Sequence, residues 1–341
     1  MSNPSTIPLQ ETAVSAGTPS ASKRGLLLFA ALGTLALLPF ALDDYYIFQL
    51  TLVMAMSIAL LGLNILTGFN GQISLGHGAF FALGAYTQAI LMSQFDVSYV
   101  LAIPAAGLVC LVFGMLFGLP ALRLEGLYLA LATFALGVSL PQLLKYRHLS
   151  PWTGGVQGIS LTKPAAPFSL ALTPDQWLYF FVLFWALLCF FTARRLLSSH
   201  VGRAIVAIRD QPIAANALGV DVARYKTFTF GVSALYTGVA GALTAVAVQF
   251  VAPDSFSLAL SIDLLVGIVV GGIASLSGAV FGALFLRFMP TVTEHLSKSA
   301  TGAIYGVVLI VFVYTMPYGI AGFVTRIGAR LSASRKQRAH G

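Results

Sequence analysis

Long runs of apolar residues dominate this chain and decide what it can fold into. A helix needs about 20 apolar residues to cross the roughly 30 Å hydrocarbon core of a bilayer. The candidate runs are residues 25–42, 46–66, 73–92, 98–119, 124–144, 177–193, 228–249, 258–273, 277–290 and 303–323. They are apolar on all sides, and only 9% of the residues are charged. This pattern is typical of a membrane-embedded helix bundle rather than of helices lying on a membrane surface.

The number of spans depends on the three shortest runs. Residues 177–193, 258–273 and 277–290 are shorter than a straight span needs, so they are tilted, partly buried by neighbours or re-entrant. We therefore predict an all-α integral membrane protein with a bundle of about ten, that is eight to ten, transmembrane helices. Whether 258–290 crosses the membrane twice or is re-entrant stays open.

The distribution of Lys and Arg predicts the orientation, because these residues accumulate in cytoplasmic loops. With ten spans and a cytoplasmic N-terminus, fourteen of the nineteen basic residues fall on the cytoplasmic side. We therefore expect both termini in the cytoplasm. The net charge of +8 follows from the same bias, so no nucleic-acid partner is predicted.

The two ends of the chain differ from the apolar core. Residues 1–24 are rich in Pro, Ser and Thr and predict a disordered polar leader before the transmembrane domain, 25–323. Residues 324–341 form a basic cytoplasmic tail suited to anionic lipid. Cys110 and Cys189 lie within predicted spans and suit apolar packing better than a disulfide or a metal site.

The stretch TGFNGQISLGHGAFFALGAY, residues 67–86, combines a turn with a helix of small residues. If the helix starts near residue 73, Ser74, Gly78 and Ala82 form one smooth face, and Gly76 and Gly84 form a second. Small residues let helix backbones approach closely in lipid. We predict a packing element here, with further close packing at Gly271, Gly272 and Gly278.

Several polar residues near or within these runs are candidates for contact with a transported solute. His77 is either a buried histidine bonded to a neighbouring helix or a contact on the solute path. No metal site is predicted, because no second ligand stands at suitable spacing. Asp263, inside the eighth run, either pairs with a hydroxyl or amide of a neighbouring helix or faces the path. The candidate pathway residues are Asn64, Gln72, Ser74, His77 and Asp263.

A connection of more than thirty residues, 194–227, separates the sixth and seventh runs on the predicted cytoplasmic side. Pro212 suits the first turn of a short helix, and Gly219 suits its end. Apolar contacts would come from Ile205, Ile208, Ile213, Leu218 and Val220. Such a segment is a candidate docking site for a partner, although a solvated basic loop is the simpler alternative.

These segments resemble the permease subunits of branched-chain amino acid ABC importers. The resemblance is carried by residues 67–86, by RLEGLYLALATFALG (123–137), TGGVQGIS (153–160) and VVGGIASLSGAVFGALF (269–285), and above all by residues 201–245. It implies a complex with a second homologous permease, two ABC ATPase subunits that bind ATP and Mg, and a periplasmic solute-binding protein. It also implies location in the bacterial inner membrane and alternating access.

Within 201–245, IAANALG resembles the coupling motif of ABC permeases. Ala214, Ala215 and Gly219 occupy motif positions, but Ile213 replaces the acidic residue. The residues expected to couple to the ATPase are Arg203, Arg209, Ala214, Ala215, Gly219 and Asp221. In 271–279, Ala274 and Ala279 stand where many relatives have Gly and Pro, which predicts a less flexible turn.

No phosphate-binding loop occurs in the chain, because the dipeptide Gly-Lys is absent. We therefore expect no catalytic residues and no cofactor in this chain, with ATP hydrolysis on separate subunits. A self-sufficient channel or secondary carrier is the rival class, although intramembrane ion sites and internal repeats are not evident. Branched-chain or other hydrophobic amino acids are the expected solutes; urea, short amides and aromatic acids are the alternatives.

Overall fold

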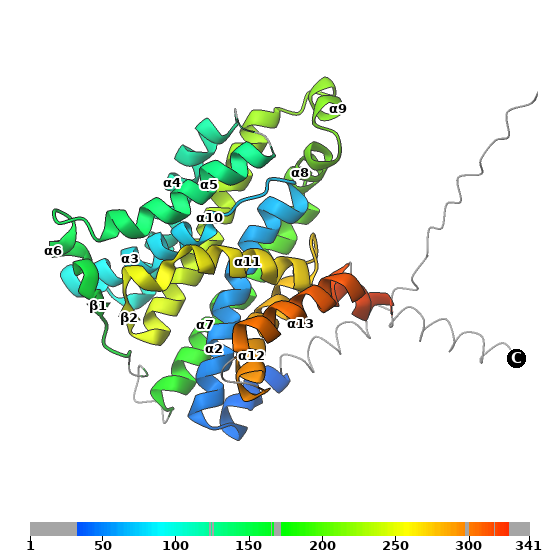
Figure 1. Cartoon of the computed structure of the whole chain (residues 1–341). Coiled ribbons are helices and arrows are strands. Elements are labelled where there is room, and N and C mark those ends of the chain that lie inside the picture. The colour runs from blue at the N-terminus through cyan, green and yellow to red at the C-terminus, as the bar shows by residue number, and fades with distance from the viewer. Residues whose placement is uncertain are drawn as a thin grey trace, which may run out of the picture.

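The computed structural model describes residues 33–122, 124, 126–164, 166, 172–296, 300–316 and 318–326. Over these residues the chain is a helix bundle with one two-residue strand pair (Figure 1). The predicted leader, 1–24, lies outside the described residues, as do most of the first run, 25–42, and most of the tail, 324–341. The described part of the first run is a helix over residues 33–41.

The longer helices follow the predicted runs closely. They are α2 (Asp44–Leu63) with the π-helical η1 (Asn64–Phe69), α3 (His77–Gln94), α4 (Tyr99–Ala121), α5 (Leu127–Leu144), α7 (Pro174–Ser198), α10 (Val222–Val248), α11 (Leu258–Gly271), α12 (Leu276–Leu296) and α13 (Thr301–Thr315). The short elements are α6 (Ser150–Thr153), η2 (Gly155–Gln157), β1 (Ile159–Ser160), α8 (His200–Asp210), α9 (Pro212–Ala217), β2 (Phe250–Val251) and η4 (Pro253–Phe256).

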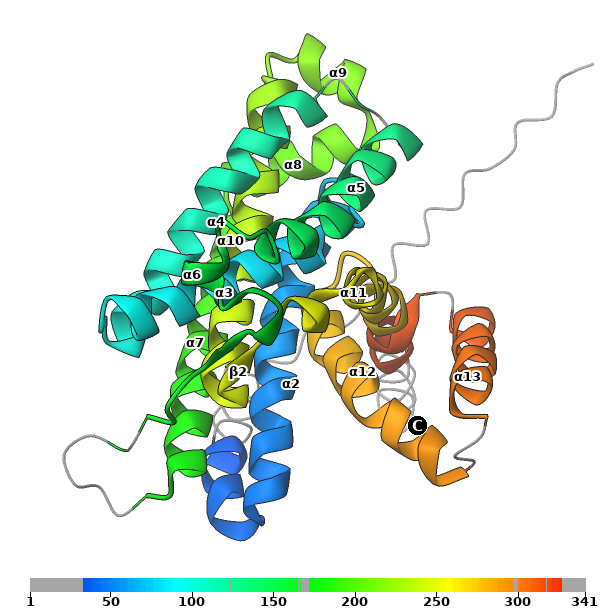
Figure 2. The ribbon, with the colours of Figure 1, turned by 60° about the vertical axis from the view of Figure 1, so that its left-hand side comes forward.

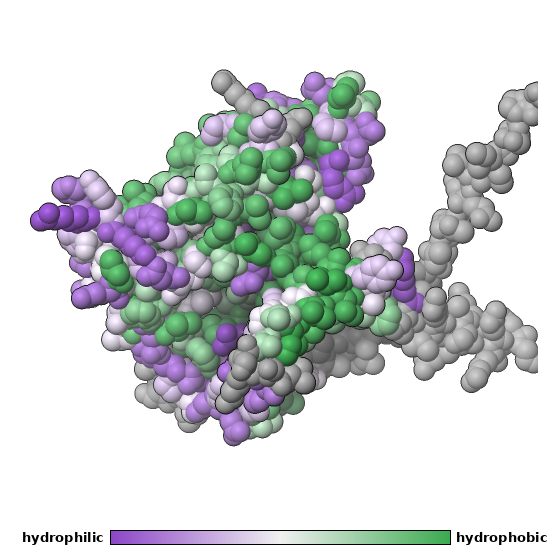
Figure 3. Space-filling view, in the orientation of Figure 1, coloured by the Kyte–Doolittle hydropathy of each residue, from purple (hydrophilic) through white to green (hydrophobic). Residues whose placement is uncertain are grey.

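Two helices form the centre of the bundle. The most apolar parts of α2 and α10 are 72% and 78% buried, whereas those of α4, α5, α7 and α12 are 28% to 33% buried. α10 packs against α2, α3 and α4, and α12 packs against α2 and α11. Figure 3 shows apolar side chains across the middle of the visible face and polar ones toward its ends. The outer helices therefore present apolar surface, as helices in contact with lipid do.

Six of the described helices are long and apolar enough to cross a membrane. A seventh span results if α13 and the helix Gly319–Arg326, which meet at 44°, count as one. This is fewer than the eight to ten transmembrane helices predicted from the sequence. α3 is more polar, since it contains His77 and Gln88, yet eleven of its eighteen residues are buried. α11 has only 14 residues, and the first run lies mostly outside the described residues.

Two runs predicted to be short are longer as helices. α7 has 25 residues because Arg194 and Arg195, which are good helix formers, continue it past the apolar segment. Its start is fixed by a capping box in which Thr173 and Gln176 bond to each other's backbone N–H groups. α12 has 21 residues and continues past Arg287 and Pro290, where the apolar run ends.

The prediction that Ser74, Gly78 and Ala82 share a helix face is wrong, because α3 begins only at His77. The Ser74 hydroxyl accepts a hydrogen bond from the Gly76 N–H at 3.4 Å, a local contact that competes with helix formation. Gly76 is the N-cap residue, so it forms no continuous stripe with Gly84 either. A Cβ on Gly76 would meet Thr133 of α5, whereas one on Gly84 would meet Gly238 of α10.

At one end of the bundle a loop layer joins distant parts of the chain. Ile159 and Ser160 pair antiparallel with Val251 and Phe250. Gly154, Gly155 and Gly158 have φ of 69°, 56° and 77°, a left-handed conformation that glycine adopts readily in turns. At the other end lie α8 and α9, as Figures 1 and 2 show.

Candidate functional site

The α8–α9 segment lies at the end of the bundle opposite the strand pair. α9 begins at Pro212, which occupies the first turn, and Gly219 follows it with φ of 87°. Both features agree with the sequence prediction. Ala214 is exposed and Ala215 is buried. The short helix therefore has one face on the protein and the other in solvent.

The apolar residues of this segment differ in exposure, and Val220 is half-buried. Ile205 and Ile208 are 0% and 1% exposed, because α8 turns them toward the bundle. They are not available to a partner, contrary to the sequence prediction. Their three-residue spacing on one helix face was the signal for this burial. Ile213 and Leu218, by contrast, are 84% and 86% exposed. The α9 patch, as we call Ile213 and Leu218, is the apolar surface of this segment that a partner could bury.

Arg209 connects the segment to the centre of the bundle. Its Nη1 donates a hydrogen bond to the Gly68 carbonyl oxygen at 3.1 Å, and its Nε contacts Asp210 at 2.9 Å. Gly71, with φ of 76°, packs on the aliphatic part of the same side chain. Arg209 thus touches the π-helix η1, a kind of helix that occurs often at functional sites.

The other charged residues of the segment make local contacts. Arg203 Nη2 lies 2.6 Å from His200 Nδ1, both on the exposed side of α8. Asp221 caps α10 by accepting from the Arg224 N–H at 3.1 Å, and its carboxylate pairs with the Arg224 guanidinium at 2.8 Å. Gln72, also near this end, is buried and donates to the Lys226 carbonyl oxygen at 3.3 Å.

Asn64 is fully buried and fixes a turn more than 200 residues away. Its Nδ2 donates to the Ser275 carbonyl oxygen at 2.8 Å, and its Oδ1 accepts from the Ala274 N–H at 2.8 Å. This turn joins α11 to α12, and in it Gly272 and Ala274 have φ of 126° and 58°. Gly278 packs against Gly271 and Gly272. Asn64 therefore holds a tight turn, and both ends of its amide are bonded within the chain.

His77 lies in a chain of hydrogen bonds between α3 and α10. Its Nδ1 is 2.9 Å from Ser74 Oγ, and its Nε2 is 2.6 Å from Ser233 Oγ. The Ser233 hydroxyl donates to the Gly62 carbonyl oxygen at 2.6 Å. The Ser233 proton is thus in use, so Nε2 carries the imidazole proton and Nδ1 accepts from Ser74. His77 and Ser74 are 0% exposed, so in this conformation they bond helices together.

Ser233 was not among the residues singled out from the sequence. A lone Ser in an apolar run gives no sign of its partner, because the partner lies on another helix. The same holds for Ser261, whose hydroxyl accepts from the Gly78 N–H at 3.0 Å and joins α3 to α11. Ala82 of α3 is fully buried.

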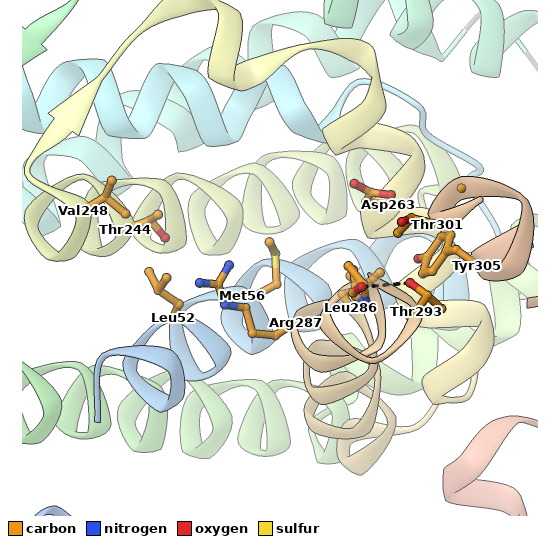
Figure 4. Close-up of a pocket in the computed structure, with 12 residues that line it drawn as sticks. Leu52, Met56, Thr244, Val248, Asp263, Leu286, Arg287, Thr293, Thr301 and Tyr305 are labelled. Atoms are coloured by element: carbon orange, nitrogen blue, oxygen red, sulfur yellow. Dashed lines mark hydrogen bonds between the residues drawn. The ribbon is translucent and has the colours of Figure 1, made fainter. Parts of the chain in front are cut away.

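Asp263 differs from the other candidate pathway residues, because it is exposed and lines a cavity of about 520 Å³. Within the part of the chain that the structure describes, no hydrogen bond or ion pair of Asp263 is present. Pairing with a hydroxyl or amide, the first of its two predicted environments, is thus not seen among the described residues, and whether Asp263 faces the solute path stays a prediction. Arg287 of α12, which the sequence analysis did not single out, lines the same cavity (Figure 4).

Comparisons with known proteins identify the family of the chain. Residues 45–313 match the family described as the permease component of branched-chain amino acid transport systems. The chain is 34% identical over 290 residues to LivM, the high-affinity branched-chain amino acid transport system permease protein, of Salmonella typhimurium and of Escherichia coli K12. That match covers 78% of this chain and 68% of each relative.

The chain is also similar to a second type of relative. The LivH permease protein of the same system in Escherichia coli K12 is 26% identical over 281 residues, which cover 77% of this chain and 89% of LivH. No solved structure matches. The extent of the family match and the identity to LivM place the chain: it belongs to the family of permease components of branched-chain amino acid transport systems.

Proposed function

We propose that this chain is the transmembrane permease subunit of an ATP-driven ABC importer in the bacterial inner membrane, and that it carries branched-chain amino acids. The family match and the names of LivM and LivH support this proposal. That both LivM and LivH are similar to the chain supports a second, homologous permease as its partner. The solute would cross between the two permeases by alternating access.

The observation that carries the proposal is the α9 patch. Ile213 and Leu218 expose most of their apolar side chains at the end of the bundle opposite the strand pair. Exposed apolar side chains on a short helix are suited to a groove on another protein. We propose that the partner is one of two ATPase subunits, which bind ATP and Mg and are absent from this chain.

The contacts behind the α9 patch suit it to transmit a movement. Arg209 joins α8 to Gly68 in η1, and Asn64 in η1 joins the turn between α11 and α12. A displacement of α9 would therefore reach α2, α11 and α12 through bonded contacts. This is a physical route from ATP hydrolysis to the transmembrane helices. It includes three of the residues expected from the sequence: Arg209, Asn64, and Gly272, whose carbonyl oxygen accepts from Asn64 Nδ2 at 3.4 Å.

The topology follows from the same proposal. With α9 on the ATPase side, 194–227 is cytoplasmic and the strand-pair layer faces the periplasm, where a solute-binding protein would dock. We propose that α3 and α11 lie within the membrane, covered by their neighbours, in addition to the six or seven apolar spans. Both termini are then cytoplasmic if the first run also crosses the membrane.

Site-directed photo-crosslinking tests the docking surface. A photoreactive amino acid at Ile213 or Leu218 should form a covalent product with a protein that carries a phosphate-binding loop, identified by mass spectrometry. Val311 on α13 is 52% exposed and provides the control position, which should react with lipid or with another membrane protein. Transport that proceeds while Ile213 and Leu218 capture no ATPase would contradict the proposal.

A further inference from the structure

The cavity that Asp263 and Arg287 line is built by five helices. It has a volume of about 520 Å³ and lies between α2, α10, α11, α12 and α13. Pockets of about 300 to 1,000 Å³ are typical of sites for small molecules. Its apolar wall includes Leu52 and Met56 of α2, Val248 of α10 and Leu286 of α12.

The cavity contains two opposite charges that do not pair with each other. No ion pair joins Asp263 to Arg287 among the described residues. Arg287 uses its Nε to donate to Gln49 Oε1 of α2. A charge within a membrane-spanning region is costly unless water, a partner or a ligand stabilises it, so such residues mark functional sites by default.

The two charges lie on different sides of the cavity. In Figure 4 the Asp263 carboxylate is near Thr301 and Tyr305 of α13, whereas the Arg287 side chain extends toward Leu52 and Met56. The bond from Arg287 to Gln49 of α2 agrees with this direction. An electric field therefore runs across the cavity, and apolar walls strengthen it because they screen charges poorly.

We propose that this cavity binds a zwitterionic amino acid with an apolar side chain, oriented with its ammonium group toward Asp263 and its carboxylate toward Arg287. The field favours this orientation of a molecule that carries both charges. The aliphatic side chain contacts the apolar wall and removes it from water. The inference rests on the proposed function for its solute class and adds the residues that recognise the two charged groups.

The same geometry discriminates against the other solutes considered. An aromatic acid offers a carboxylate to Arg287 but leaves Asp263 without a positive partner. Urea carries no charge, so it cannot pair with the Asp263 carboxylate or with the Arg287 guanidinium group. A site whose polar groups are left unpaired rejects a ligand strongly, so zwitterions are preferred.

Protection of an engineered cysteine tests the site without relying on transport. Thr244→Cys places a thiol in the cavity wall with little change in volume, and the native Cys110 and Cys189 are buried. The purified complete complex is treated with methyl methanethiosulfonate, and the labelling rate is followed by mass spectrometry. Ser275→Cys, in a separate cavity of about 320 Å³, is the matched control.

Leucine should slow labelling of Thr244→Cys and leave Ser275→Cys unaffected. Leucinol, which lacks the carboxylate, and 4-methylpentanoate, which lacks the ammonium, should each protect about tenfold less well, as expected for the loss of one bond to a charged group. Asp263→Asn should remove the advantage of leucine over 4-methylpentanoate, and Arg287→Gln should remove its advantage over leucinol.

Three results would overturn the inference. These are no labelling of Thr244→Cys, no protection by leucine, and equal protection by urea or benzoate. ATP-driven leucine uptake and the presence of ATPase subunits are measured in the same preparation. ATP-driven uptake without protection by leucine would reject the binding site in this cavity but not the proposed function. Selective protection in a preparation without ATPase subunits would support the binding site and reject the proposed function.

Discussion

The guanidinium group of Arg209 donates a hydrogen bond to the Gly68 carbonyl oxygen at 3.1 Å and joins the α8–α9 segment to η1. Gly68 lies close to Asn64 and to the Ala274 backbone, so no larger residue fits at that position. The segment that carries the exposed α9 patch is therefore bonded to the packed centre of the bundle. A rigid contact of this kind is what a movement imposed on α9 requires.

Arg209→Met should weaken coupling while the protein still folds. Methionine retains part of the stem that packs on Gly71 but cannot bond to Gly68. Loss of a hydrogen bond from a charged group corresponds to about tenfold in an equilibrium, so uptake per ATP hydrolysed should fall by up to about that factor. Arg224→Met is the control, because that side chain is 87% exposed and pairs with Asp221 at the surface. Equal ratios of uptake to hydrolysis in the two variants would show that Arg209 does not couple.

Ala274→Gly should stabilise the protein. Ala274 has φ of 58°, a left-handed conformation that costs an L-residue about 1 to 2 kcal/mol. Glycine loses more entropy on folding, so the net gain should be about 0.5 to 1 kcal/mol in the free energy of unfolding. Ala279→Gly, in the helical and buried part of α12, should instead destabilise. Unfolding of the purified complex measures both, and a destabilised Ala274→Gly variant would contradict the account.

Gly84→Ala should destabilise the contact between α3 and α10. A Cβ on Gly84 would lie 2.5 Å from the Gly238 Cα, and backbone atoms there cannot move aside easily. We expect a loss of about 1 to 3 kcal/mol, as for other overpacked sites. Gly306→Ala on α13 has no atom within 4 Å of the added Cβ and should be neutral or slightly stabilising. A comparison of melting temperatures checks the pair, and equal losses would rule out a specific backbone contact.

His77 and Ser233 should be energetically coupled. Alanine at either position removes the hydrogen bond between α3 and α10, so the second substitution should cost less than the first. Hydrogen bonds between membrane helices contribute about 0.6 to 2 kcal/mol, which sets the expected coupling energy. A double-mutant cycle on His77→Ala and Ser233→Ala, followed by SDS unfolding of the complex, measures it. Additive losses would mean that the 2.6 Å contact contributes nothing specific.

Local patterns in the sequence predicted the helices well. Hydropathy located α2, α4, α5, α7, α10 and α12, because an apolar run of that length has few alternatives in a membrane. Pro212 and Gly219 predicted the ends of α9, because each acts through its own backbone geometry. The start of α3 was predicted too early, because the Ser74 side chain bonds locally and delays the helix.

The long-range contacts could not be predicted in the same way. Asn64 bonds to Ser275, which is 211 residues away, and neither residue carries a sign of the other. Ile205 and Ile208 were assigned to a partner because the segment was treated as a loop, whereas α8 buries them. Arg287 was a missed signal, since an arginine within the apolar run 277–290 is costly in a membrane unless it serves a polar site.

The composition of the complex tests the central proposal most directly. The chain is extracted gently from its native membrane, and the intact assembly is weighed and sequenced by mass spectrometry. The account predicts one copy of this chain, a second homologous permease and two ATPases with phosphate-binding loops. A chain that purifies alone and still conducts solute across vesicles without ATP would contradict it and identify a channel or secondary carrier.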